Sequence, residues 1–132
     1  MVFVALFLAL AAISCTTTPG ETSTGTLQGK VHIGPLSPVE IPGVKPPVNP
    51  EVFAARKVMV YDKDGRKLIS QVDIKQINQS NEGFYSVPLK PGIYVVDINR
   101  LGIDFGRELP RQIEIKPGQT VELNIDIDTG IR

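Results

Sequence analysis

The side chains that most often perform covalent or acid–base chemistry are scarce in this sequence. The chain has one cysteine, Cys15, and one histidine, His32, among its 132 residues. A nucleophile activated by a base, or a metal site built from histidines, needs more of these groups than the chain supplies. Only carboxylate chemistry is left, so we expect that the protein is not an enzyme and carries no cofactor.

Cys15 sits where an apolar run gives way to small polar residues. The uncharged run from Met1 to Ile13 is too short to cross a bilayer, which needs about 20 apolar residues, and it matches the apolar core of a signal peptide. The tetrapeptide Ala12-Ile13-Ser14-Cys15 resembles a bacterial lipobox, which implies cleavage before Cys15 and lipid attachment to its thiol. An ordinary secretory signal cut near Ser14 and an uncleaved hydrophobic tail are the alternatives.

Location and charge limit the partners. Lipidation of Cys15 predicts an exported protein on the cell membrane, or on the outer membrane because Thr16 and not Asp follows the cysteine. The 14 basic and 14 acidic residues cancel, and none precedes Cys15. Nucleic acids are bound by clustered Lys and Arg, so they are not expected partners. We expect the membrane, through the lipid anchor, and an unknown envelope protein or glycan.

Composition divides the chain into three parts. Residues 1–14 form the predicted signal peptide and residues 15–25 a flexible tether of small polar residues. Residues 26–132 form one domain, long enough for a hydrophobic core. With no cysteine after Cys15, this domain must be stabilised by packing and not by disulfides.

From Leu27 onward, apolar and polar residues alternate in the manner of half-buried strands. Turn sequences such as Lys90-Pro91-Gly92 separate most of the alternating segments, which are residues 27–33, 58–61, 68–74, 85–89, 94–98, 113–115 and 121–127. Seven strands that each have one apolar face are best buried as two sheets face to face. The sequence therefore predicts an all-β fold, a seven-stranded antiparallel β-sandwich.

One segment carries a family resemblance. Residues Gly83 to Val96 read G-F-Y-S-V-P-L-K-P-G-I-Y-V-V. This resembles the G-x-Y-x-V-x-L-x-P-G-x-Y-x-V run of carboxypeptidase regulatory-like domains, which have a prealbumin-like (transthyretin-like, Cna-B-like) sandwich. The resemblance implies that fold and indicates no activity.

A narrower resemblance concerns the two ends of the domain. Ile33-Gly34-Pro35, followed by Pro38-Val39, and the terminal Asp128 to Arg132 resemble small exported bacterial and archaeal proteins of unassigned function. In those proteins the early loop often contains cysteines, which this chain lacks. We expect Ile131 to pack against the proline-rich loop, residues 34–52, near Pro35 and Pro38.

The candidate interaction surface is apolar. Tyr85 and Tyr94 belong to the core face by alternation, and the chain has no Trp. The remaining candidates for an exposed apolar cluster, which would be a partner-binding patch, are Phe53, Met59, Tyr61 and Phe105. Alternatively, Phe53 and Phe105 pack their loops onto the sandwich.

Carboxylates offer a calcium hypothesis with a plain alternative. Asp62-Lys63-Asp64-Gly65 copies the opening of a calcium loop but lacks its closing Glu, so a turn is favoured. Asp126 and Asp128 lie on the outer face of the last strand, where Asp97 or Asp104 can join them only if the strands are neighbours. Outward carboxylates are normally just solvated.

Lys30 and Asn124 lie on the first and last strands, the places of the pair that forms an isopeptide bond in related adhesin domains. Both alternate outward, where the desolvation that this reaction needs is missing. The sequence thus favours a lipid-anchored, non-enzymatic structural or protein-interaction module of the cell envelope. The alternative is an envelope lipoprotein that binds a carbohydrate, a peptide or calcium.

Overall fold

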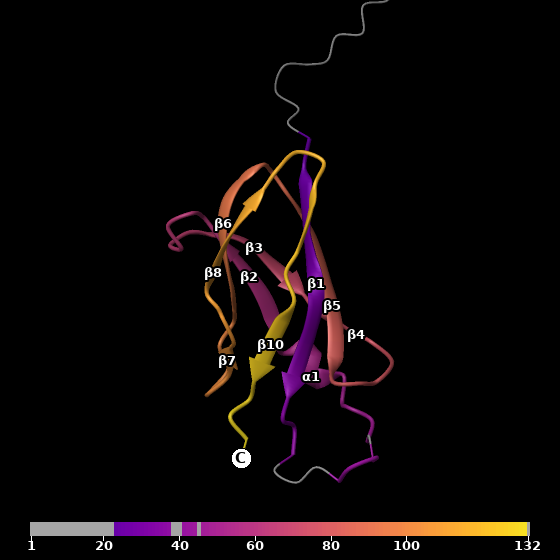
Figure 1. Cartoon of the computed structure of the whole chain (residues 1–132). Helices are drawn as coiled ribbons and strands as arrows, with labels where there is room; N and C mark the ends of the chain where they lie inside the picture. The colour runs from indigo at the N-terminus through magenta and orange to yellow at the C-terminus, as the bar shows by residue number, and fades with distance from the viewer. Residues whose placement is uncertain (1–22, 38–40, 45, 132) are drawn as a thin grey trace, which may run out of the picture.

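The computed structural model describes residues 23–37, 41–44 and 46–131. These residues form two β-sheets packed face to face, as Figure 1 shows, so the prediction of a β-sandwich is confirmed. The predicted signal peptide, Cys15 and most of the predicted tether lie outside the described residues. The first strand begins at Gly25, the last residue of the predicted tether.

The two sheets differ in size. In spatial order, sheet A contains β4 (Lys75–Gln76), β5 (Glu82–Leu89), β1 (Gly25–Gly34), β10 (Ile125–Asp128) and β7 (Phe105–Gly106), and β9 (Thr120–Glu122) also pairs with β1. Sheet B contains β3 (Leu68–Asp73), β2 (Lys57–Tyr61), β6 (Gly92–Ile98) and β8 (Arg111–Ile115). A four-residue helix, α1 (Glu51–Ala54), follows the proline-rich loop.

The seven expected strands all occur among the ten that the structure contains. The additional ones arise because the last strand divides into β9 and β10, and because β4 and β7 are two-residue strands at the edges of sheet A. One feature differs from the expected antiparallel arrangement. The strands β9 and β10 lie beside β1 in the same sheet and run parallel to it.

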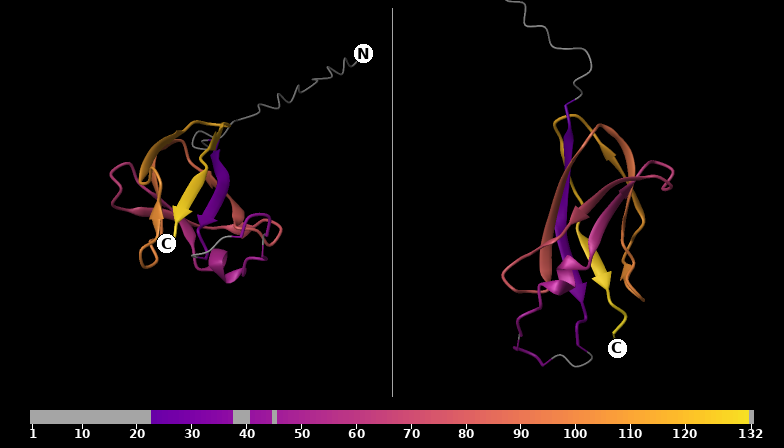
Figure 2. Two further views of the ribbon diagram at one scale, coloured as in Figure 1. Left: turned by 60° about the horizontal axis from the view of Figure 1, so that its bottom comes forward. Right: turned by 180° about the vertical axis from the view of Figure 1, so that it is seen from behind.

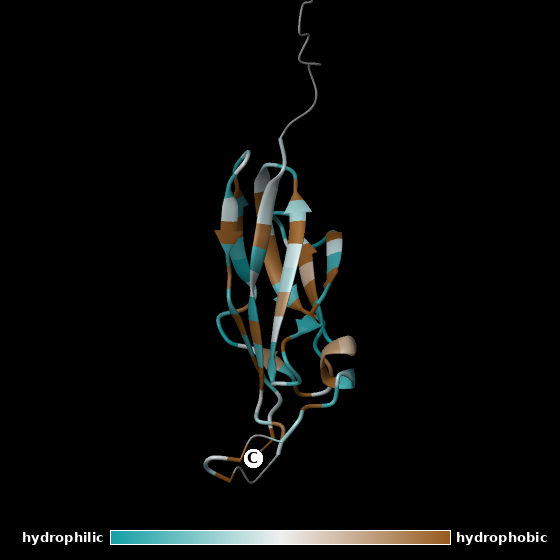
Figure 3. Cartoon of the chain, turned by 90° about the vertical axis from the view of Figure 1, so that its right-hand side faces the viewer, coloured by the Kyte–Doolittle hydropathy of each residue, from teal (hydrophilic) through white to brown (hydrophobic). Residues whose placement is uncertain are grey.

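The core lies between the sheets and follows the alternation of the sequence. Along β5 the burial pattern alternates strictly, with Tyr85, Val87 and Leu89 inside and Pro88 outside. The same alternation appears as brown and teal bands along the strands in Figure 3. Burial of each such side chain contributes about 1.5–3 kcal/mol, so the facing apolar surfaces supply most of the stability.

The two ends of the sandwich carry different segments. The chain enters at Gly25, at the upper end in Figure 1, where β1 begins. The proline-rich loop and the C-terminus lie at the opposite end, as both Figure 1 and the rear view in Figure 2 show. Since β1 runs from one end to the other, Gly34 is far from the point where the tether enters.

The close approach of β1 and the C-terminal segment depends on Gly29. A Cβ at Gly29 would lie 2.0 Å from the carbonyl oxygen of Leu123, so no larger residue fits. Tyr85 pairs with Gly29 on the other side, and its buried hydroxyl donates a hydrogen bond of 2.6 Å to that same oxygen. Burial raises the pKa of the Tyr85 hydroxyl, which keeps it protonated as a donor.

We predict that Gly29→Ala lowers the free energy of unfolding by at least about 2 kcal/mol, because the added methyl group meets backbone that cannot move aside. Gly34→Ala on the same strand is the matched control, since its nearest neighbour is the half-exposed His32 ring at 3.3 Å, which has to shift by only a few tenths of an ångström. That change should cost within about 0.5 kcal/mol. Denaturant unfolding measures both, and equal losses would contradict the close approach at Gly29.

Candidate functional site

His32 is the centre of a polar network on the outer face of sheet A. Its Nδ1 lies 3.1 Å from Asp126 Oδ1, and its Nε2 lies 2.9 Å from Asn81 Nδ2. The network is satisfied when Nδ1–H donates to Asp126 and Nε2 accepts from Asn81. Arg107 adds a cation, with its Nε 3.6 Å from Asp126 Oδ2. The side chains of His32, Asp126 and Arg107 are all about half exposed to solvent.

Two adjacent hollows lie on this face and share His32 and Asp126. The first, of about 260 Å³, is lined by Lys30, Val31, His32, Glu82, Asn124, Ile125 and Asp126. The second, of about 370 Å³, is lined by His32, Gly34, Pro35, Asn81, Arg107, Asp126 and Asp128. We call the two hollows together the sheet A cleft. Because its lining is mostly polar and charged, it suits a hydrophilic ligand.

Strand register explains why these residues meet. The pairing of β1 with β10 places His32 opposite Asp126 and Gly34 opposite Asp128. Glu82 is the first residue of β5 and lies opposite His32. Asn81 lies in the turn that precedes β5. The cleft therefore combines three strands that are widely separated in the sequence.

The two terminal motifs of the domain come together at the cleft. Thr129 N–H donates to the Gly34 carbonyl at 3.2 Å, and the Thr129 hydroxyl donates to the Pro35 carbonyl. Asp128 Oδ1 accepts a hydrogen bond from Gly130 N–H, which fixes the end of β10. The C-terminal segment thus contacts the entry of the proline-rich loop through Thr129. Pro38 and Arg132 lie outside the described residues, and the packing of Ile131 against the loop stays a prediction.

We predict that Thr129→Val accelerates proteolysis within the proline-rich loop, because the Pro35 carbonyl loses its donor. Pro35 is half-buried, and a hydrogen bond of this kind contributes about 0.5–1.5 kcal/mol. The control is Thr120→Val, which removes an exposed hydroxyl at the other end of the molecule. Limited proteolysis with mass mapping is the measurement. Equal cleavage rates in both variants would show that Thr129 does not hold the loop.

Asp97 and Asp104 do not join Asp126 and Asp128, so the calcium alternative at these residues is not supported. Asp104 is buried and accepts two hydrogen bonds from Arg56, at 2.8 and 3.1 Å, which hold the β6–β7 loop against α1. Asp97 lies on β6 of sheet B and forms an ion pair with Arg100. Neither therefore joins Asp126 and Asp128. Within residues 23–37, 41–44 and 46–131, no three His, Cys, Asp or Glu side chains are grouped so that they can hold a metal ion.

Asp62 serves a turn. Its Oδ1 accepts the backbone N–H groups of Arg66 at 3.0 Å and Lys67 at 3.3 Å. Led by the bond from Arg66, these hydrogen bonds lower the pKa of the Asp62 carboxyl. The carboxylate therefore stabilises the connection between β2 and β3.

The four candidate residues of the interaction surface do not lie together. Phe53 is only 2% exposed, so its assignment to an exposed surface was wrong. Its ring packs against β5 at Gly83, where an added Cβ would lie 2.7 Å from the ring. Phe105 is exposed at the edge of sheet A. Met59 and Tyr61 lie half-buried on the outer face of sheet B.

Sheet B has an apolar outer face that is larger than the sequence indicated. Tyr61 pairs with Val95 on β6 and with Leu68 on β3, and a bulge beside this pair adds Ile69. Leu68, Ile69 and Ile93 are each about 44% exposed. Alternation alone misses Leu68 and Ile69, because a bulge changes the period of two.

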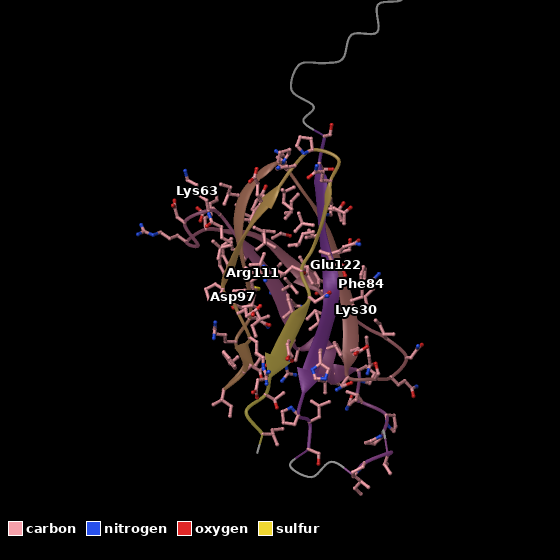
Figure 4. The ribbon with its side chains drawn as sticks, viewed as in Figure 1. Lys30, Lys63, Phe84, Asp97, Arg111 and Glu122 are labelled. Atoms are coloured by element: carbon pink, nitrogen blue, oxygen red, sulfur yellow. The ribbon has the colours of Figure 1, made fainter. Side chains whose placement is uncertain are left out.

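Phe84 is an exposed aromatic residue that was not among the predicted candidates for the interaction surface. Because the neighbouring Tyr85 points into the core, the Phe84 side chain points outward, and it is 37% exposed on the outer face of sheet A. Lys30 lies directly across from Phe84 on β1, and Lys75 lies across from it on β4. Figure 4 shows Phe84, Lys30 and Glu122 gathered on this sheet, away from Lys63 and Asp97.

Lys30 and Asn124 are adjacent in space, as their places in the sequence suggested. The contact is a hydrogen bond of 2.9 Å from the backbone N–H of Lys30 to Asn124 Oδ1, and both residues are exposed. The Asn124 side chain thus takes the place of a backbone carbonyl where β9 and β10 separate. Its role in the structure is to complete the pairing with β1.

Comparison with known proteins finds one structural similarity at low sequence identity. No family model and no curated protein matches the chain. Among solved structures, it is similar to GBS52, the minor pilin of the Gram-positive pathogen Streptococcus agalactiae, with a TM-score of 0.45 and 18% identity. The match covers 80% of this chain and 44% of that pilin, so the chain spans less than half of the pilin's length.

The described residues contain no helix long and apolar enough to cross a membrane.

Proposed function

We propose that this protein is a non-enzymatic binding module of a bacterial cell envelope, held to a membrane by a lipid on Cys15. The resemblance of Gly83 to Val96 to carboxypeptidase regulatory-like domains supports a sandwich domain, and the scarcity of Cys and His in the sequence supports a role without catalysis. The lipobox-like Ala12 to Cys15 supports the anchor.

The position of the sheet A cleft is the observation that carries the proposal. The tether enters at Gly25, whereas the cleft is formed at the other end of β1, from Lys30 to Pro35. An anchored domain would therefore present the cleft away from its own membrane. Ion pairs and hydrogen bonds hold the side chains around it, which reduces the entropy lost when a ligand binds.

The chemistry of the cleft favours binding over catalysis. His32 already has Asp126 and Asn81 at its two ring nitrogens, and Asp126 also faces Arg107. Among the residues that the structure describes, none that lines the cleft is a Ser, Thr or Cys that His32 can activate as a nucleophile. Such a network presents donors and acceptors in fixed positions.

The anchor is tested by fatty-acid labelling. We predict that the wild-type chain incorporates a labelled fatty acid and fractionates with membranes, and that Cys15→Ala abolishes the label. Ser14→Ala is the matched control and should remain labelled, because the thiol is intact. An exported wild-type protein without label would contradict the anchor.

The cleft is tested separately, by retention of the protein in the envelope residue that remains after lipids are extracted with detergent. We predict that Arg107→Gln combined with Asp126→Asn weakens retention about tenfold, which corresponds to about 1.4 kcal/mol of lost contact. The control combines Arg111→Gln with Glu108→Gln, an exposed pair also 3.6 Å apart but outside the cleft. Equal retention of both double variants would contradict a binding role for the cleft.

A further inference from the structure

The outer face of sheet A carries an aromatic platform next to the cleft. Phe84 lies directly across from Lys30 on the neighbouring strand and two residues along β5 from Glu82. Both Lys30 and Glu82 line the first hollow of the cleft. Gly83 and Tyr85 face the core, so the Phe84 ring is directed outward. An exposed aromatic ring beside a polar cleft forms a continuous surface from β4 across to β10.

The polar groups along this surface are planar and arranged in rows. The row of Glu82, His32 and Asp126 crosses β5, β1 and β10, and the row of Lys75, Phe84 and Lys30 lies beside it. Asn124 and Asn81 add amides at the two ends of the cleft. Carboxylate, imidazole and amide groups can each accept or donate to a hydroxyl, which itself does both.

A sugar chain matches this combination. The C–H face of a pyranose ring stacks on an aromatic side chain, and its hydroxyl groups hydrogen-bond with planar polar groups. From the level of Phe84 to that of Asp128, β1 spans four residue steps, or about 13 Å, which exceeds one sugar ring. Because the two hollows join end to end through His32 and Asp126, a linear chain can occupy both.

The charges on the platform indicate an acidic sugar. Lys30 and Lys75 lie on opposite sides of Phe84, and neither ammonium group forms an ion pair with any residue in the described part of the chain. Arg107, at the far end of the cleft, is paired with Asp126, and the carboxylates of Glu82 and Asp128 also line the cleft. Lys30 and Lys75 are therefore the cations that face a ligand carboxylate, and the rest of the cleft suits uncharged hydroxyl groups. A carboxylate on a stacked ring would meet a cation on either side.

We propose that the outer face of sheet A binds an acidic linear polysaccharide, with Phe84 stacking against a sugar ring and Lys30 and Lys75 pairing with its carboxylates. This inference rests on the proposed function, because it names the ligand class of the same cleft. Phe84 and the two lysines extend that cleft by one row.

The test measures binding of the full-length chain, in mild detergent, to three polymers immobilised on beads. Peptidoglycan strands freed of their stem peptides carry carboxylates on the sugar, chitin carries acetyl groups without charge, and cellulose carries neither. We expect the peptidoglycan strands to bind at least about tenfold more tightly than chitin or cellulose. Intact sacculi form a fourth arm, and binding to sacculi but not to the stripped strands would overturn the proposal in favour of a peptide ligand.

Variants identify the residues. Phe84→Ala should weaken binding to the stripped strands about tenfold, whereas Ile93→Ala, which removes a similarly exposed apolar side chain from the outer face of sheet B, should leave it unchanged. Lys30→Gln with Lys75→Gln should lower the affinity for the strands to that for chitin. Thermal unfolding verifies that each variant is folded.

The outcomes separate this inference from the proposed function. Loss of strand binding in the Phe84 and lysine variants alone supports the polysaccharide. Binding of all polymers alike, or no loss in the lysine variant, overturns the acidic ligand. If envelope retention depends on Arg107 and Asp126 while no polysaccharide binds, the inference fails and the binding module stands.

Discussion

The parallel pairing of β1 with the C-terminal segment is the constraint on which the rest of the structure depends. The same offset of 94 residues relates the two strands from Thr26 and Thr120 at one end to Gly34 and Asp128 at the other. Midway, Gly29 lets the Leu123 carbonyl approach, and Tyr85 satisfies that carbonyl from inside the core. A shift of one residue would turn every side chain of the C-terminal strand to the other face.

That register creates the cleft. With the offset fixed, His32 lies beside Asp126, and Gly34 lies beside Asp128. The same pairing brings Thr129 to the proline-rich loop. The cleft is thus built on paired strands, which hold side chains more firmly than loops do, and a loop closes only one end of it.

The outer faces of the two sheets differ in chemical character. Sheet A presents charged and amide groups around Phe84, with Phe105 at its edge, and sheet B presents Tyr61, Ile93 and the bulged Leu68 and Ile69. An exposed apolar face of this kind is typical of contact surfaces in proteins. The difference explains why a hydrophilic ligand is expected on sheet A.

Alternation in the sequence was sufficient for the sandwich, because each strand has one apolar face and the turns are marked by Gly, Pro and Asp. It also placed Tyr85 and Leu123 in the core and His32 outside. It could not give the parallel register of the first and last strands, since register depends on contacts between distant segments. For this reason the partners of Asp126, which are His32 and Arg107, were missed.

The most direct test of the account is amide chemical-shift mapping by NMR, with the isotope-labelled chain titrated with a soluble digest of whole bacterial envelope. The account predicts shifts along the outer face of sheet A, at Lys30, His32, Phe84 and Asp126. Shifts confined to the outer face of sheet B, at Tyr61, Leu68 and Ile93, would contradict it.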